Sequence, residues 1–110
     1  GALRLRCVHC GEEVVTTYRL TPAAVRDLSS IWDDTEERGD AQQAEIYLAE
    51  IRAAIERVAQ RPERGRSCDD VREGYLRYTI GSHVIFYRAN PHTVDVIRIL
   101  HQRMDPTLHF

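Results

Sequence analysis

The sequence predicts an α+β fold: an N-terminal strand, then an antiparallel helical hairpin packed on a twisted antiparallel β-sheet, in the order β-α-α-β-β-β. Three observations support this class. Apolar residues recur every three or four positions over residues 22–58, the period of amphipathic helices. Residues 75–100 alternate between apolar and polar and are interrupted by turn residues, as half-buried strands are. The last strand then ends on three polar residues, 101–103, which indicates a functional surface at the end of the sheet.

The first expected strand, residues 16–20, leads directly into the first helix. The hydroxyl group of Thr21 can cap that helix, and Pro22 suits its first position because no N–H is needed there. Gly39 is expected to end the helix in the left-handed conformation. The apolar side of the helix is expected to carry Val25, Leu28, Trp32 and Thr35.

The second helix is the more strongly patterned one. Asp40 and Gln43 form a capping box at its start, and Pro62 stops it. Its apolar positions are Ala44, Tyr47, Leu48, Ile51, Ile55 and Val58. Because only about two residues separate the helices, we expect an antiparallel hairpin whose apolar sides face the sheet.

Residues 61–72 read as a polar connector, and three strands follow it. The first strand is expected over residues 75–80, and Gly81-Ser82 is suited to a tight hairpin turn. The second strand is expected over residues 83–89, and the third over residues 94–100 after a turn at Asn90-Pro91-His92. The strand at residues 16–20 is expected to join this meander at an edge.

Composition predicts a soluble, single-domain, cytoplasmic protein. The chain has 110 residues, and no apolar run approaches the roughly 20 residues of a membrane span. Its net charge is −2 and all 15 basic residues are arginine, which argues against tight binding of nucleic acid by the whole surface but leaves a local arginine cluster possible. Three cysteines, an odd count, fit a reducing compartment better than a disulfide framework.

Residues 1–15 are expected to be an N-terminal extension outside the core, and residues 16–110 to form the domain. The spacing of Cys7 and Cys10 matches one half of a zinc knuckle, but no second cysteine pair follows to complete four ligands. We therefore expect neither a metal nor a cofactor.

Short motifs accompany the predicted order of elements. They are Tyr18-Arg-Leu-Thr-Pro-Ala-Ala, Ile31-Trp32, Gln43-Ala44-Glu45, Tyr47-Leu48, Pro62-Glu-Arg-Gly65-Arg66, Gly81-Ser-His83, Phe86-Tyr87-Arg88 and Ile99-Leu-His-Gln-Arg-Met-Asp105. Taken together, residues 16–110 resemble the ParE toxins of the RelE/ParE superfamily of bacterial type II toxin–antitoxin modules. The ending from Arg98 to Asp105 is the most specific part of this resemblance.

The resemblance implies a protein that inhibits DNA gyrase by binding, without being an enzyme. It also implies a ParD-like antitoxin whose disordered C-terminal segment folds on the toxin and whose N-terminal half dimerises and binds operator DNA. The expected complex is a heterotetramer or larger, and the toxin meets operator DNA only through the antitoxin.

The alternative is a RelE-like toxin that cleaves messenger RNA on the ribosome. That reaction needs a base, an acid and a cation at the phosphorane. His101 could supply the base or acid, Arg98 and Arg103 the cation, and Tyr87 or Glu73 could lie nearby. The slightly acidic charge balance argues against this alternative, because such an enzyme needs a basic surface for RNA.

Six residues are predicted to contact gyrase or the antitoxin: Arg98, His101, Arg103, Trp32, Tyr47 and Tyr87. Arg98 is the most telling, because an arginine inside an apolar strand needs a carboxylate, a backbone acceptor or a partner protein. Trp32 and Tyr47 belong first to the helix–sheet interface and become anchors for an antitoxin helix if they are exposed.

Each of these residues also has a purely structural interpretation. Tyr87, like Tyr75, Tyr78 and Phe86, fits cross-strand packing better than a stacking platform for bases. The polar residues after the last strand could simply pair with nearby acids and cap exposed backbone.

Overall fold

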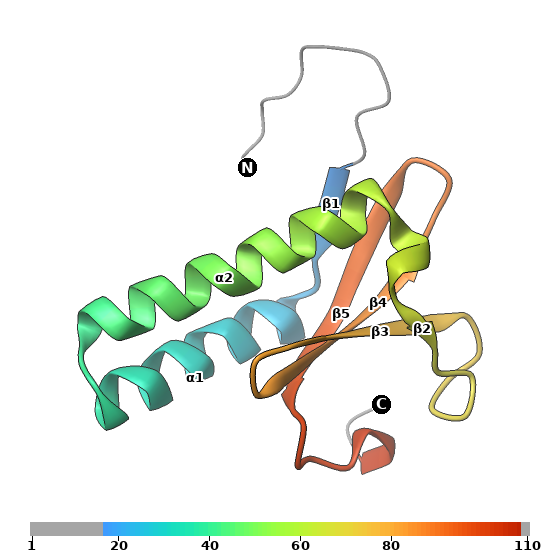
Figure 1. Ribbon diagram of the computed structural model, residues 1–110. Helices are drawn as coiled ribbons and strands as arrows, with labels where there is room; N and C mark the ends of the chain where they lie inside the picture. Colours follow the sequence, from blue (N-terminus) through green and yellow to red (C-terminus); the bar gives the residue numbers. More distant parts are fainter. Residues whose placement is uncertain (1–16, 109–110) are drawn as a thin grey trace, which may run out of the picture.

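Two helices cover one face of a five-stranded sheet in the computed structural model, which describes residues 17–108 (Figure 1). The elements run in the order β1 (Thr17–Leu20), α1 (Pro22–Arg38), α2 (Ala41–Gln60), η2 (Pro62–Arg64), β2 (Arg66–Ser67), β3 (Tyr75–Ile80), β4 (His83–Ala89), β5 (Thr93–His101) and η3 (Pro106–Leu108). The predicted α+β class and element order are confirmed. The predicted extension at residues 1–15, with Cys7 and Cys10, lies outside the described residues.

Both helices begin where their capping residues predict. Thr21 has an extended backbone, and its Oγ1 accepts a hydrogen bond from the Ala24 N–H at 3.1 Å. Asp40 does the same for α2, since its Oδ1 accepts from the Gln43 N–H at 2.8 Å. Each cap satisfies one of the N–H groups that a helix start leaves unpaired.

The end of α1 differs from the prediction. Gly39 has φ −131°, so it is not in the left-handed conformation expected of it. Its N–H still donates to Thr35 O at 3.0 Å, and Asp40 behind it is already the extended cap of α2. The connection is so short that the chain turns through extended backbone and has no room for a separate left-handed cap.

The apolar side of α1 is rotated from the predicted one. Ala24 and Ile31 are the buried residues, with Leu28 packed beside them, whereas the predicted Val25 is 51% exposed. Trp32 is half-buried. Both sets of positions have helical spacing, and the smaller Ala24 faces inward because α1 lies close to β5 and α2, with which it makes most of its contacts.

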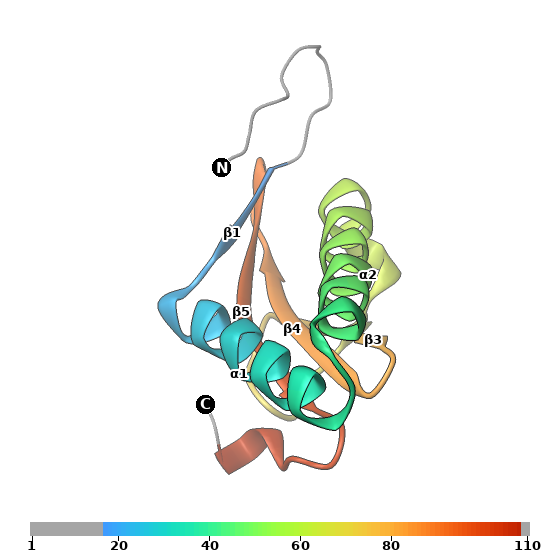
Figure 2. The same ribbon diagram turned by 90° about the vertical axis from the view of Figure 1, so that its left-hand side faces the viewer.

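Helix α2 packs as predicted. Ala44, Ile51, Ile55 and Val58 are buried, and Tyr47 and Leu48 pack against the core at its margin. Figure 2 shows the two helices side by side along the sheet, with α2 next to β3 and β4. This helix therefore supplies most of the helical contribution to the main core.

The sheet has the order β1-β5-β4-β3-β2. Strands β3, β4 and β5 form the predicted antiparallel meander. Strand β1 joins at an edge, as predicted, but it runs parallel to β5, so the whole sheet is mixed rather than antiparallel. Two helices separate β1 from the other strands along the chain, and a connection of that length permits either direction.

The connector after α2 holds more structure than predicted. It contains η2 and the two-residue strand β2, which pairs antiparallel with β3. Cys68 follows β2 and is buried with Phe86 and Leu100 in a second, smaller core on the face of the sheet away from the helices. Among the described residues, no helix is long and apolar enough to cross a membrane.

Candidate functional site

The free edge of β5 organises the candidate site. Strand β1 pairs with β5 only as far as Leu20 and Val96, so no strand of residues 17–108 pairs with the second half of β5 on that side. Thr21 continues the hydrogen bonding along this edge: its N–H donates to Val96 O at 3.1 Å, and its Oγ1 donates to Ile97 O at 2.7 Å. The start of α1 is thereby fixed against this edge.

Asp27 continues this edge from the second turn of α1. Its carboxylate accepts two hydrogen bonds from Arg98, from Nε at 2.8 Å and from an Nη at 2.9 Å, and one from the Ile99 N–H at 2.9 Å. The side chains are only 13% and 22% exposed, respectively. The hydrogen bonds to Asp27 raise the pKa of Arg98 above its usual value, so the guanidinium stays charged. The prediction that Arg98 needs a carboxylate or another acceptor is confirmed.

A second cluster lies at the same end of β5 and joins α2 to the sheet. The hydroxyl group of Tyr47 lies 2.7 Å from His83 Nδ1 and accepts the Ser82 N–H at 3.1 Å. The rings of His83 and His101, which are cross-strand partners on β4 and β5, meet edge to face with centroids 5.2 Å apart. Gly81 permits this packing, because its φ is +59° and a Cβ would come within 2.8 Å of the Tyr47 oxygen.

The environment of His83 favours the neutral ring. Burial lowers its pKa below 6.5, and the neighbouring His101 lowers it further. Asp34 and Asp27 oppose this effect, while Arg38 adds to it. The His83 ring is therefore neutral near neutral pH, in contrast to the charged Asp27–Arg98 pair beside it.

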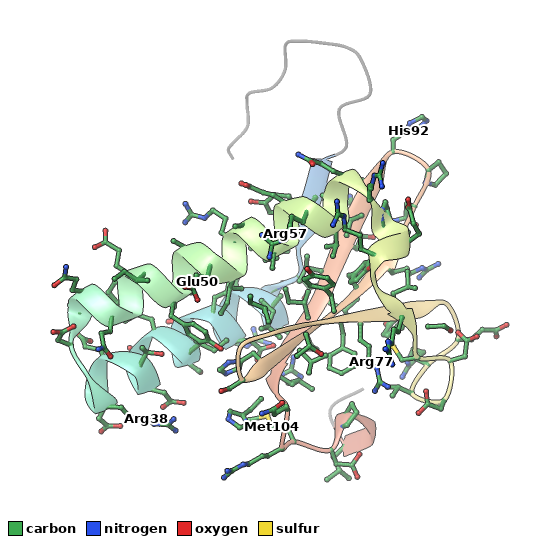
Figure 3. All side chains as sticks on the ribbon, viewed as in Figure 1. Arg38, Glu50, Arg57, Arg77, His92 and Met104 are labelled. Carbon is green, nitrogen blue, oxygen red and sulfur yellow. The ribbon has the colours of Figure 1, made fainter. Side chains whose placement is uncertain are left out.

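The residues after β5 form a turn at its end, in which the Met104 N–H donates to His101 O at 2.8 Å. The Arg103 N–H donates to His101 Nδ1 at 3.1 Å, which fixes the orientation of the ring at the end of the strand. The Arg103 side chain is exposed, and Met104, 47% exposed, follows it at the same end of the molecule (Figure 3). A basic and an apolar side chain thus stand next to each other at the surface.

A shallow groove of about 410 Å³ runs beside Tyr47 where the two helices meet. Its lining residues are Thr35, Gln43, Ile46, Tyr47 and Glu50. Ile46 is 54% exposed, which is unusual for a large aliphatic side chain and is repeated by Val25 on α1. Trp32 is half-buried and is not among the side chains packed on the main core.

The structure thus brings four of the six predicted residues, Arg98, His101, Arg103 and Tyr47, to one end of β5. Trp32 lies on the helix that carries Asp27, and Tyr87 lies elsewhere: it is fully buried, and its hydroxyl group donates to Pro62 O at 2.5 Å. Tyr87 therefore packs in the core, as its structural interpretation predicts, and its contact with a partner stays a prediction.

Sequence reasoning missed two members of the site, Asp27 and His83. Asp27 looks like an ordinary solvent-facing acid of α1, and no local signal distinguishes it. His83 did carry a signal, because it belongs to the Gly81-Ser-His83 motif and directly follows the hairpin turn. Among residues 17–108, no three His, Cys, Asp or Glu side chains are grouped so that they could hold a metal ion.

Comparisons with known proteins agree with this fold. The model of the family "ParE toxin of type II toxin-antitoxin system, parDE" matches residues 18–106. Toxin ParE1 of Mycobacterium tuberculosis is 51% identical over 89 residues, 80% of this chain and 91% of that protein. Toxin ParE1 of Caulobacter vibrioides is 42% identical over 92 residues, 84% of this chain and 95% of that protein.

Two solved structures share the architecture. A chain of the chromosomal ParDE toxin–antitoxin system from P. aeruginosa superposes with a TM-score of 0.70 at 16% identity, covering 81% of this chain and 98% of that one. A chain of the toxin–antitoxin complex RelBE2 from Mycobacterium tuberculosis gives a TM-score of 0.58 at 25% identity, covering 79% and 98%. With the family match across nearly the whole described region, these findings show that the chain belongs to the ParE toxins of type II toxin–antitoxin systems.

Proposed function

We propose that this toxin inhibits DNA gyrase by binding to it and that a ParD-like antitoxin neutralises it in the cytoplasm. The family match supports a toxin of this type, and the ParDE and RelBE2 structures come from toxin–antitoxin systems. The toxin binds without making or breaking a covalent bond. Operator DNA is bound by the antitoxin, within a complex that is a heterotetramer or larger.

The engagement of Arg98 by Asp27 is the observation that carries this proposal. Two guanidinium nitrogens of Arg98 already bind both carboxylate oxygens, so this cation is neutralised rather than held ready for a phosphorane. Two of the other candidates for RNA cleavage are apart from it, since Tyr87 is buried under η2 and Glu73 is exposed in the loop before β3. A preformed, internally paired surface suits recognition of a partner better than acid–base chemistry.

We assign the end of β5 to gyrase. His101 and Arg103 provide polar groups there, and Met104 adds exposed apolar area beside them. Interfaces favour this mixture, because an apolar contact excludes water from around the polar ones. The bidentate pair behind them holds β5 in place, so the surface needs little reorganisation on binding.

We assign the groove between the helices to the antitoxin. Tyr47 and Ile46 line it, and Trp32 and Val25 offer further apolar area on α1. An amphipathic helix that folds on binding can place apolar anchors in such a groove. Tyr47 also bonds to His83, next to His101, so the antitoxin groove and the gyrase surface share a side chain network through which occupation of one can affect the other.

Purified toxin added to gyrase and relaxed plasmid should block supercoiling or trap cleaved DNA. His101→Ala and Arg103→Ala should each weaken inhibition by roughly tenfold or more, the effect of losing an interface anchor. His92→Ala is a matched control, because His92 is an exposed histidine in the turn at the opposite end of β5 (Figure 3).

The competing activity is tested with the same proteins. Translating ribosomes with a reporter message should show no toxin-dependent cleavage. Message cleavage that His101→Ala abolishes, together with unaffected gyrase, would establish the nuclease instead. In that case the adjacent rings of His83 and His101 could serve as an acid–base pair.

A further inference from the structure

A second polar hollow lies at the opposite edge of the sheet, where η2, β2 and β3 meet. It has a volume of about 410 Å³, and three of its lining side chains are arginines that come from three different elements. The full lining is Arg64, Arg66, Arg77, Tyr78, Thr79 and Val84. None of these arginines takes part in the candidate site at the end of β5.

The fold places the like charges of these three arginines close together. Arg66 and Arg77 are direct cross-strand partners, and like charges in that position destabilise a strand pair. All three are exposed. The ion pairs found in the described part of the chain involve other arginines, Arg19 and Arg98, and none of the three arginines of the hollow forms one there.

The segment that carries Arg64 and Arg66 is held in place by the buried side chain of Tyr87. The Tyr87 hydroxyl group donates to Pro62 O, which fixes the start of η2 over the buried ring. Gly65 lies against the same hydroxyl group: a Cβ there would come 2.1 Å from the Tyr87 oxygen and 2.8 Å from Arg77 O. Only glycine fits, and Arg64 and Arg66 are therefore presented by a backbone locked to the core.

The edge of β3 next to the hollow is paired from Tyr75 to Arg77, and beyond Arg77 it has no strand partner among residues 17–108. The Cys68 N–H donates to Tyr75 O at 2.9 Å, so the backbone groups of Tyr75 and of every second residue after it, Arg77 and Thr79, point toward the β2 side. Strand β2 starts at Arg66, opposite Arg77. The backbone N–H and C=O of Thr79 therefore face a position that no strand of residues 17–108 occupies.

We propose that this hollow is a docking site for an extended acidic peptide segment of a protein partner, which pairs with β3 at Thr79 while its carboxylates bind Arg64, Arg66 and Arg77. Guanidinium groups bind carboxylates through paired hydrogen bonds, and an open strand edge supplies the N–H and C=O groups that a peptide backbone matches. A nucleic acid has no peptide backbone that could pair with both the N–H and the C=O of a strand residue, and the net charge of −2 disfavours a long polyanion.

The antitoxin is the natural source of such a segment, and that assignment alone rests on the proposed function. Peptide binding at the hollow does not depend on it. The two can fail separately: a toxin that binds the peptide but leaves gyrase active refutes the proposed function, whereas one that inhibits gyrase but ignores the peptide refutes this inference.

The test measures fluorescence anisotropy of a labelled octapeptide of alternating Glu and Val with the full-length toxin. We expect Arg77→Gln and Arg66→Gln each to weaken binding by about tenfold or more, the scale of a lost charge-assisted contact. Arg38→Gln is the matched control and should change binding less than about twofold, because Arg38 lies at the far end of the helical hairpin (Figure 3). The same peptide with Gln in place of Glu should not bind.

Backbone pairing is tested by modifying the probe. Two further octapeptides carry N-methyl groups on all Val or on all Glu residues, and one of them should lose binding because the residue opposite Thr79 must offer its N–H to β3. Equal binding by wild type and Arg77→Gln overturns the inference, as does full binding of both methylated peptides. An oligothymidylate of equal charge that binds more tightly than the peptide, and is lost in Arg77→Gln, would assign the hollow to nucleic acid instead.

Discussion

Removing the Asp27 carboxylate is expected to be among the most costly single changes to a polar side chain of this fold. Asp27→Ala removes three hydrogen bonds that the carboxylate accepts, two from Arg98 and one from the Ile99 N–H. A bond to a charged group contributes roughly 1.5–3 kcal/mol, and an unpaired backbone N–H costs about 1–3 kcal/mol. Because Arg98 is 22% exposed and water can partly replace the carboxylate, we expect a loss of about 3 kcal/mol in the free energy of unfolding.

Two further variants divide that loss. Asp27→Asn keeps an oxygen for the Ile99 N–H and loses the charge, so about half of the effect should remain. Arg19→Ala is the matched control, since its pair with Asp95 spans 2.9 Å but Arg19 is 70% exposed. A pair so exposed should contribute less than about 1 kcal/mol.

Urea denaturation followed by the fluorescence of Trp32, the single tryptophan, gives the free energies of unfolding. A double-mutant cycle of Asp27→Ala with Arg98→Met should show a coupling energy of about 1.5–2 kcal/mol. A coupling energy below about 0.5 kcal/mol, or an Asp27→Ala no less stable than Arg19→Ala, would refute this account of the β5 edge.

Three other predictions follow from the buried groups. Because the pKa of His83 is below 6.5, the folded state resists protonation of this ring. The free energy of unfolding should be largest above pH 6.5 and should fall as the pH drops from there toward the folded pKa. Measured at pH 7.5 and 5.5, this free energy should decline less in His83→Gln than in the wild type. Gly65→Ala should destabilise the fold by about 2 kcal/mol, because the new Cβ clashes with the Tyr87 oxygen. In thermal melts, the same change in a Tyr87→Phe background should cost less, because the oxygen is gone. Stability losses of the two changes that simply add would contradict the clash. Burial raises the pKa of the Cys68 thiol, so alkylation mapped by mass spectrometry should modify it far more slowly in the folded protein than in urea, and equal rates would contradict its burial.

Local signals account for what the sequence predicted well. A helix start depends on a side chain reaching an N–H three residues away, so Thr21 and Asp40 could be identified as caps without any tertiary information. The hairpin turn at Gly81-Ser82 and the alternation along β3 are equally local. The helical hairpin and the antiparallel meander follow from these short-range rules.

Features that depend on which element packs where were predicted less well. The inward side of α1 was set by close packing at Ala24, while spacing alone allowed the exposed Val25 to take that place. The parallel direction of β1 and the two-residue strand β2 were also missed, because neither a long connection nor a two-residue pairing leaves a periodic pattern.

The sequence alone established the element order, the caps and the need of Arg98 for an acceptor, because each depends on residue type and near neighbours. Only the tertiary structure decided that the acceptor is Asp27, 71 positions away, and that Arg66 faces Arg77 across a strand pair. Contacts between distant residues are created when elements pack together, and the charges they bring together become visible only in the folded chain.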